Sequence, residues 1–114
     1  MSETAQKVFH KFLVYAPDKR DEGALGRRLS VRDQHVVVTR QNIASGFIRV
    51  ASALITPESL DQEQKKMVGS VFICEAENAE KVREMIEADI YYTSDVWDPE
   101  KIVILGMLPA TPLP

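Results

Sequence analysis

Cysteine and histidine are scarce in this chain of 114 residues, which holds one cysteine and two histidines. The single Cys74 excludes an internal disulfide framework and is typical of a reducing compartment, so we expect a cytoplasmic protein. Because His10, His35 and Cys74 are the only imidazole and thiol groups, a dedicated zinc site lacks ligands. We therefore expect no metal.

Phosphate-binding and basic segments are missing as well. Gly23 and Gly26 give only a GxxG spacing in a polar segment, which is not a phosphate-binding loop. The formal net charge is −3 and the basic residues are scattered, which argues against a nucleic-acid partner. No apolar run approaches the roughly 20 residues needed to cross a bilayer, and residues 1–7 lack the apolar stretch of a signal peptide. We expect no membrane partner.

The hydrophobic content of 45% is ordinary for a soluble globular protein. The length fits one domain over residues 1–114. We expect its ordered core at about residues 7–108, after a short N-terminal segment and before a proline-rich tail that cannot continue a strand.

The pattern of β-branched and aromatic residues predicts the secondary structure. Four strands are expected, at residues 7–16, 46–55, 67–76 and 100–108. A helix is expected over residues 78–89, with Asn78 as its N-cap and Glu80 in the first turn. Residues 17–28 and 56–66 are expected as polar loops, the second as the tip of a hairpin.

The segment VRDQHVVVTR, residues 31–40, fits either a strand or a helix. Ser30 and Asp33 have the spacing of a weak capping box, and Gly46 stands where a helix C-cap glycine belongs. One line of that helix would hold Val31, His35, Val38 and Asn42, widened by Val36 and Ile43. A strand would leave two polar loops around five residues, so we favour the helix. The order β-α-β-β-α-β predicts an α+β, ferredoxin-like fold with an antiparallel sheet and both helices on one face.

The second face of such a sheet has no helices over it. The strands are apolar at most positions, as in Phe12–Val14, Val71–Ile73 and Ile102–Leu105, whereas a solvated face would alternate with polar residues. Short, central strands would also explain this pattern. We favour a homodimer, with Phe72 and Ile104 at its interface.

His35 and Asp89 are candidates for a catalytic pair. Asp89 continues the apolar row of the second helix, where the helix dipole and partial burial both disfavour a carboxylate without a partner. If His35 is that partner, the aspartate fixes one imidazole nitrogen and leaves the other as a general base. The alternatives are a core histidine bonded to a backbone carbonyl and a solvent-facing aspartate.

Several motifs together resemble the YCII-related family. They are KFLVYAPDK, the RxxH of Arg32 and His35, Gly69-Ser70 entering a strand that ends in EA, and EADIYYTSDVWD. The resemblance covers about residues 9–106, and it implies a dimeric α+β barrel, in which two ferredoxin-like sheets pack face to face. The family has a His–Asp pair suspected of catalysis, which matches His35 and Asp89. Ile90 stands in place of the usual proline after the aspartate.

The resemblance also implies a class of chemistry without metal or organic cofactor. It implies a lyase or isomerase that carries out elimination, dehydration or proton transfer on a small, oxygenated, cyclic metabolite. His35 and Asp89 would be catalytic, while Arg32, Tyr91 and, more weakly, Arg49 would bind substrate. Two alternatives stay open: a non-catalytic dimer that binds a small molecule, and a cofactor-free oxygenase like other dimeric α+β barrels.

Overall fold

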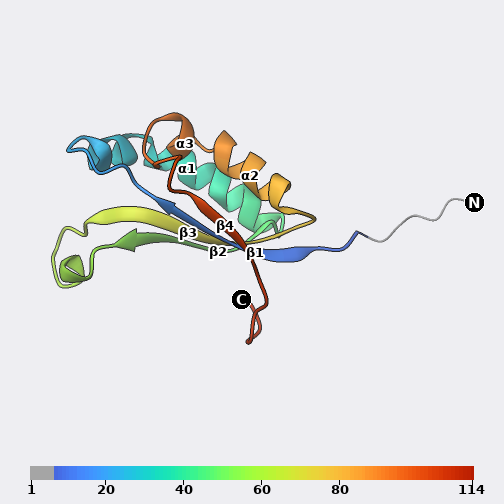
Figure 1. Ribbon diagram of the computed structural model, residues 1–114. Coiled ribbons are helices and arrows are strands. Elements are labelled where there is room, and N and C mark those ends of the chain that lie inside the picture. The colour runs from blue at the N-terminus through green and yellow to red at the C-terminus, as the bar shows by residue number, and fades with distance from the viewer. Residues whose placement is uncertain (1–6) are drawn as a thin grey trace, which may run out of the picture.

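The structure, a computed structural model, describes residues 7–114; the first six residues of the predicted N-terminal segment lie outside this range. Within residues 7–114, one antiparallel sheet of four strands carries the three α-helices on one face (Figure 1). The elements are β1 (His10–Pro17), α1 (Ala24–Ala44), β2 (Ile48–Ile55), the 3-10 helix η1 (Pro57–Ser59), β3 (Met67–Ala76), α2 (Ala79–Ala88), α3 (Ile90–Thr93) and β4 (Val103–Met107).

The strand order is β2-β3-β1-β4, with every neighbouring pair antiparallel. This order and the β-α-β-β-α-β sequence of main elements confirm the predicted ferredoxin-like fold. The third strand has the predicted bounds, and Asn78 caps α2 by accepting a hydrogen bond from the Lys81 N–H, as predicted. Strands β1 and β2 begin three and two residues later than predicted, β1 runs one residue further, and β4 is shorter at both ends. The short helices η1 and α3 were not predicted.

The predicted start of the first helix was wrong. Helix α1 begins at Ala24, inside the expected loop, and Ser30 is not its N-cap: the Ser30 hydroxyl donates to the Arg27 carbonyl. Ion pairs with the preceding segment hold these first turns, because Arg27 pairs with Asp21 and Arg28 with Asp18. These contacts outweigh the low helix propensity of Gly26, while Gly23 stands at the N-cap.

The far end and the packed face of α1 are partly as predicted. The helix ends before Gly46, whose φ of 87° is the left-handed conformation that follows many helix ends. Val38 and Ile43, however, are each 46% exposed, although we expected them to pack. The packed stripe passes instead from His35 through Thr39, which is half-buried.

Alternating residues of the strands separate the two faces of the sheet. Toward the helices lies a buried core that includes Val14, Phe72 and Trp97, with Ile104 packed against it. The placement of Phe72 and Ile104 on the open face was therefore wrong. Because both sets of alternating positions are apolar, the sequence pattern does not show which set meets the helices.

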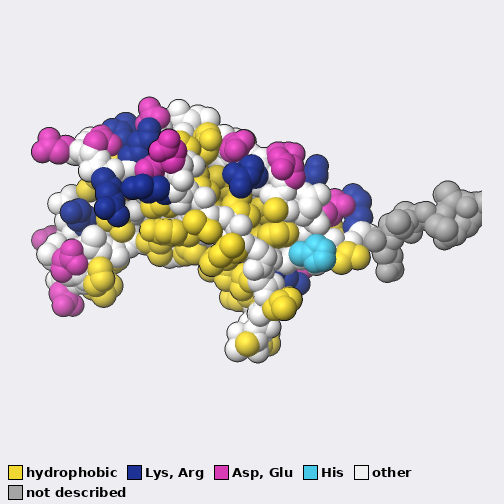
Figure 2. Space-filling model, in the orientation of Figure 1, with side chains coloured by type: hydrophobic (Ala, Val, Ile, Leu, Met, Phe, Trp, Pro, Cys, Tyr) yellow, Lys and Arg dark blue, Asp and Glu magenta, His cyan; other side chains and the backbone are white. Residues whose placement is uncertain are grey.

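The opposite face is also rich in apolar side chains, and no helix of residues 7–114 covers it (Figure 1). By register and alternation, this open face carries Leu13, Tyr15, Val50, Leu54, Val71, Ile73, Val103, Leu105 and Met107. Figure 2 shows hydrophobic side chains gathered along the sheet below the helices. Tyr15, Val103 and Leu105 are exposed.

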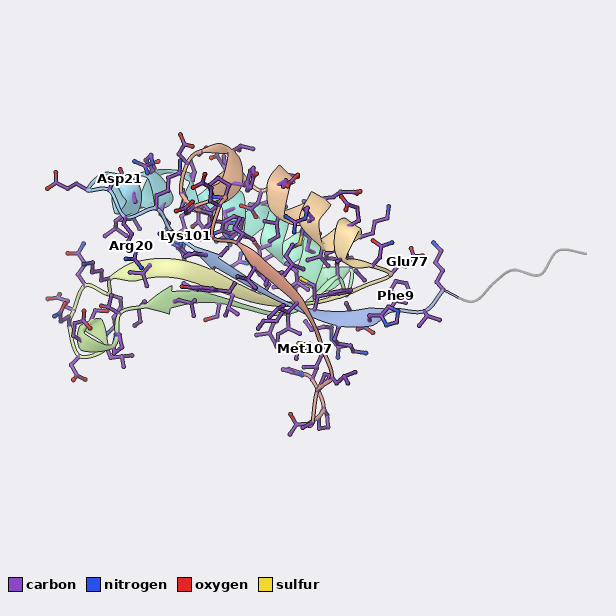
Figure 3. The ribbon with its side chains drawn as sticks, viewed as in Figure 1. Phe9, Arg20, Asp21, Glu77, Lys101 and Met107 are labelled. Atoms are coloured by element: carbon purple, nitrogen blue, oxygen red, sulfur yellow. The ribbon has the colours of Figure 1, made fainter. Side chains whose placement is uncertain are left out.

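The loops at the two ends of the sheet are charged. Figure 3 places Arg20 and Asp21 before α1 at one end, and Phe9 and Glu77 near the start of β1 at the other. No helix within residues 7–114 has the length and apolar character to span a membrane.

Candidate functional site

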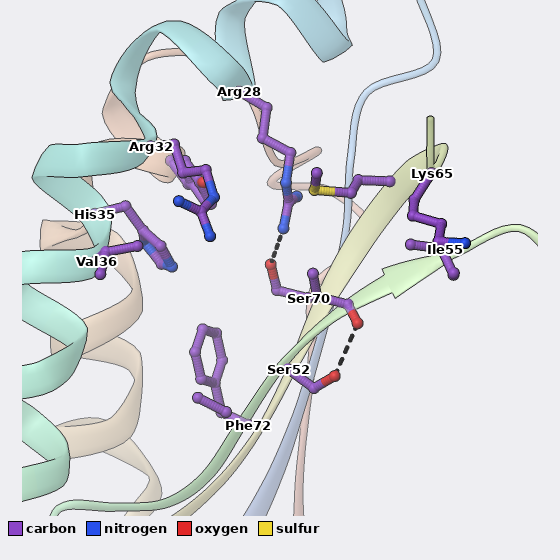
Figure 4. Close-up of a pocket in the computed structure, with 13 residues that line it drawn as sticks. Arg28, Arg32, His35, Val36, Ser52, Ile55, Lys65, Ser70 and Phe72 are labelled. Carbon is purple, nitrogen blue, oxygen red and sulfur yellow. Dashed lines mark hydrogen bonds between the residues drawn. The ribbon is translucent and has the colours of Figure 1, made fainter. Parts of the chain in front are cut away.

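A cavity of about 370 Å³ lies between α1 and the β2–β3 hairpin (Figure 4). Helix α1 contributes Arg28, Arg32 and His35, which sit on one side because they are spaced three and four residues apart. The full lining is Arg28, Arg32, His35, Val36, Ala51, Ser52, Ala53, Ile55, Lys65, Met67, Ser70, Phe72 and Tyr91.

The strand β2 forms the floor with small side chains. Its register shifts between Ile48 and Val50, and beyond this bulge Ala51 pairs with Phe72 and Ala53 with Ser70. Paired residues share a face, so both alanines point to the helix side, beneath α1. Their short side chains leave the space that the cavity occupies.

The structure brings His35 and Asp89 together. The imidazole Nδ1 lies 2.8 and 2.9 Å from the two carboxylate oxygens of Asp89, and His35 is 9% exposed. The other ring nitrogen, Nε2, lies 3.3 Å from the Thr39 hydroxyl, which is long for a hydrogen bond. The contact with Asp89 orients the imidazole with Nδ1 toward the carboxylate, and Nε2 is left with only the weak contact to Thr39.

Asp89 occupies a joint between two helices. It ends α2 and is the N-cap of α3, with extended backbone angles (φ −71°, ψ 143°), and its carboxylate accepts from the Tyr91 N–H at 2.8 Å. We expected the carboxylate to meet only the negative end of the α2 dipole. In addition, it caps the start of α3 by accepting the Tyr91 N–H, the usual role of an N-cap aspartate.

Three aromatic rings enclose His35. Tyr91 stacks on the imidazole at a centroid distance of 3.8 Å and an interplanar angle of 10°. Trp97 meets it edge-on at 6.0 Å, and Phe72 lies 6.4 Å away. Desolvation by burial raises the pKa of the Tyr91 phenol, although Arg28 and Arg32 act against this shift. The phenol therefore stays protonated near neutral pH and can serve as a hydrogen-bond donor.

Arg28 is one residue of this site that the sequence pattern did not reveal; Lys65 is another. Arg28 is the more deeply buried of the two. Its side chain is 3% exposed and binds both carboxylate oxygens of Asp18, at 2.7 and 2.9 Å, and the Ser70 hydroxyl. The guanidinium also lies 4.7 Å from the centroid of the Tyr91 ring. Burial raises the pKa of Asp18, while the attraction of Arg28 acts in the other direction. The pair fixes the wall next to Tyr91.

The remaining predicted binding residues are divided between two places. Arg32 and Tyr91 line the cavity with His35, but Arg49 does not. Arg49 binds Glu75 at 2.6 Å and the backbone oxygen of Pro114, so its position does not support the predicted role. His10 is exposed at the first position of β1, and Trp97 is buried in the core with its indole N–H donating to Ser70.

Metal ligands do not gather around this cavity. Nowhere in residues 7–114 do three His, Cys, Asp or Glu side chains group in a way that would hold a metal ion. Cofactor independence remains a prediction.

Comparisons with known proteins bear on this geometry. Residues 11–104 match the model of the YCII-related domain. The fusaric acid biosynthesis protein 2 of Gibberella fujikuroi is 28% identical over 94 residues, which cover 82% of this chain and 88% of that protein.

A solved structure with a similar fold is that of an enzyme bound to a small molecule. It is the 5-chloro-2-hydroxyhydroquinone dehydrochlorinase of Burkholderia phenoliruptrix in complex with 2,5-dihydroxybenzoquinone. The TM-score is 0.70 at 22% sequence identity, and the match covers 83% of this chain and 90% of that one.

Proposed function

This chain belongs to the YCII-related domain family, and we propose that it is a cofactor-independent lyase or isomerase acting on a small, oxygenated, cyclic metabolite. The observation that carries the proposal is the His35–Asp89 contact at 2.8 Å in the wall of the cavity. Both named relatives support the class: one is a dehydrochlorinase of a hydroquinone and the other a biosynthesis protein.

The proposed mechanism is proton transfer by one imidazole. Asp89 accepts the Nδ1–H of His35, so the Nε2 lone pair serves as the general base. Nε2 takes a proton from the substrate, and the electron pair of the broken bond forms a double bond. In an elimination, the leaving group departs with its own electron pair; in an isomerisation, the imidazolium returns the proton to another atom. Asp89 stabilises the imidazolium between these steps.

Tyr91 and Arg32 would assist. The phenol can donate a hydrogen bond to a substrate oxygen, and the guanidinium stabilises negative charge on an enolate oxygen. The stacking of Tyr91 on His35 would keep the donor and the base in fixed relative positions.

We further propose that the functional unit is a homodimer whose interface is the open face of the sheet. Nine apolar side chains lie there, and no described helix covers them. A contiguous apolar surface of this kind commonly marks an interaction site in a soluble protein. A second copy offers the same surface, and two such faces can pack about 10 Å apart.

Activity measurements test the catalytic pair. The probe is 5-chloro-2-hydroxyhydroquinone, with chloride release as the readout. His35→Gln and Asp89→Asn should each lower kcat by about 10²–10⁴-fold, the usual contribution of general acid–base catalysis. The double variant should be little worse than His35→Gln, because the two residues act as one unit. Turnover coupled to oxygen consumption would favour the oxygenase alternative, and a substrate that binds without turnover would favour the binding-protein alternative.

A second measurement needs no substrate. In ¹⁵N NMR spectra of the neutral imidazole, His35 should carry its proton on Nδ1, because both Asp89 oxygens accept there. Asp89→Asn keeps an oxygen that caps α3 but adds an N–H₂ donor, so it should produce a mixture of tautomers. Wild-type protein with the proton on Nε2 would remove the proposed base.

A further inference from the structure

The cavity concentrates positive charge in an acidic protein. Among residues 7–114, three cationic side chains line it, Arg28, Arg32 and Lys65, and no Asp or Glu does. The whole chain, by contrast, has a formal net charge of −3. This local excess is a property of the site and not of the general surface.

The three cations are not equivalent. Arg28 is neutralised by the two carboxylate oxygens of buried Asp18. For Arg32 and Lys65, the described residues provide no carboxylate at salt-bridge distance. Within the described part of the chain, the Lys65 ammonium donates only to the backbone oxygens of Leu60 and Gln62. Two positive charges at the cavity are therefore left without a counter-charge in the described chain.

These two residues come from opposite sides of the cavity. Arg32 stands one helical turn before His35 and extends from α1 toward the strands, while Lys65 belongs to the β2–β3 hairpin (Figure 4). A group held by both would bridge the helix and the hairpin. Arg32 also lies near enough to the Tyr91 phenol to lower its pKa against the effect of burial.

We infer that the cavity takes an anionic substrate, a small ring with a carboxylate or an ionised acidic hydroxyl group, and that Arg32 and Lys65 bind its charged oxygens. This inference rests on the proposed function, since it concerns the same cavity. Binding of the anion would place the ring between the hairpin and His35. The forked guanidinium suits two oxygens of one group, and the ammonium supplies a second charge.

The test measures binding of matched acids and neutral analogues, without turnover. One pair is benzoate and benzamide, and the other is 2,5-dihydroxybenzoquinone and its dimethyl ether. Wild-type protein should bind at least one acid roughly tenfold to hundredfold more tightly than its neutral analogue, as charged hydrogen bonds would give. The pair that shows the preference identifies the charged group as a carboxylate or an ionised enol.

Matched variants assign the preference to the two cations. Arg32→Gln with Lys65→Gln should abolish it and flatten the salt dependence of binding. The control combines Arg40→Gln, on the same helix, with Lys66→Gln, the neighbour of Lys65; neither residue lines the cavity, so the change in net charge is equal and the preference should persist.

Two results would overturn the inference: equal binding of acids and neutral analogues by wild type, or a preference that survives the Arg32/Lys65 variant. His35→Gln should keep the preference while losing turnover. Failure of the proposed catalytic pair is therefore distinguishable from failure of the anion site.

Discussion

Two neighbouring residues of β3 show how the two faces of the sheet differ. Phe72 is 2% exposed and lies among the core side chains, 6.4 Å from His35. Ile73, the next residue, points to the open face and is only partly buried. Both residues are large and apolar, so the difference arises from what covers each face. Helices cover one; the other has the composition of a core without a covering layer.

A charged substitution on each face should distinguish their roles. The larger loss of folding stability is expected on the face that the helices cover. Phe72→Asp removes a core ring and buries a carboxylate, which should cost more than about 5 kcal/mol and unfold the protein. Ile73→Asp should leave a folded chain that no longer dimerises. Circular dichroism and sedimentation equilibrium report these two outcomes.

The matched control is Ile73→Val, which should keep both fold and dimer. Wild-type protein at micromolar concentration should sediment at about twice the chain mass of 12.8 kDa. A folded wild-type monomer, or an Ile73→Asp variant that still dimerises, would contradict the proposed interface.

A smaller effect should follow from the buried ion pair at the edge of the helix-covered face. Arg28→Met leaves the Asp18 carboxylate buried without its partner, and should destabilise the fold by about 3–5 kcal/mol in urea unfolding. Adding Asp18→Asn removes the unpaired charge and should recover part of this loss. Additive losses in the double variant would show that the two side chains do not act as a pair.

The smallest expected effect is a difference in reactivity between two thiols, one on each face of the sheet. Burial raises the pKa of Cys74 to about 12, and its side chain lies on the helix side, so an aromatic disulfide reagent should react with it only on unfolding. An engineered Ile73→Cys should react readily in the monomer and become protected as protein concentration rises. If the reaction rate of the Ile73→Cys thiol does not change with protein concentration, a second copy does not cover the open face.

Local signals were sufficient for most of the fold. The strand over Met67–Ala76 and the helix capped by Asn78 were predicted because alternation, caps and turns are encoded within a few residues. The start of α1 was not, because it depends on Arg28 reaching Asp18, ten residues earlier. Which strand face meets the helices was also not predictable, since both faces are apolar.

The residues of the candidate site also fall into those that the sequence predicted and those that it did not. His35 and Asp89 were candidates for a pair because Asp89 continues the apolar row of its helix and His35 lies at the edge of the packed face; in the structure their side chains lie 2.8 Å apart. The placement of Arg28 in the wall could not be predicted while its segment was taken for a loop. Arg49 was placed in the wrong environment because the bulge beside it changes the register of β2.

The floor of small residues has a consequence for how the site can diversify. Ala51 and Ala53 limit the size of the ring that fits, yet neither is among the hydrogen-bonding partners of His35 or Asp89. Replacing either by a larger side chain would narrow the site and leave the proposed proton-transfer groups, His35 and Asp89, in place. Under the proposed function, the size of the ring is set on a strand and proton transfer on two helices, so descendants of one such protein could accept larger or smaller rings through two positions while keeping the same proposed reaction.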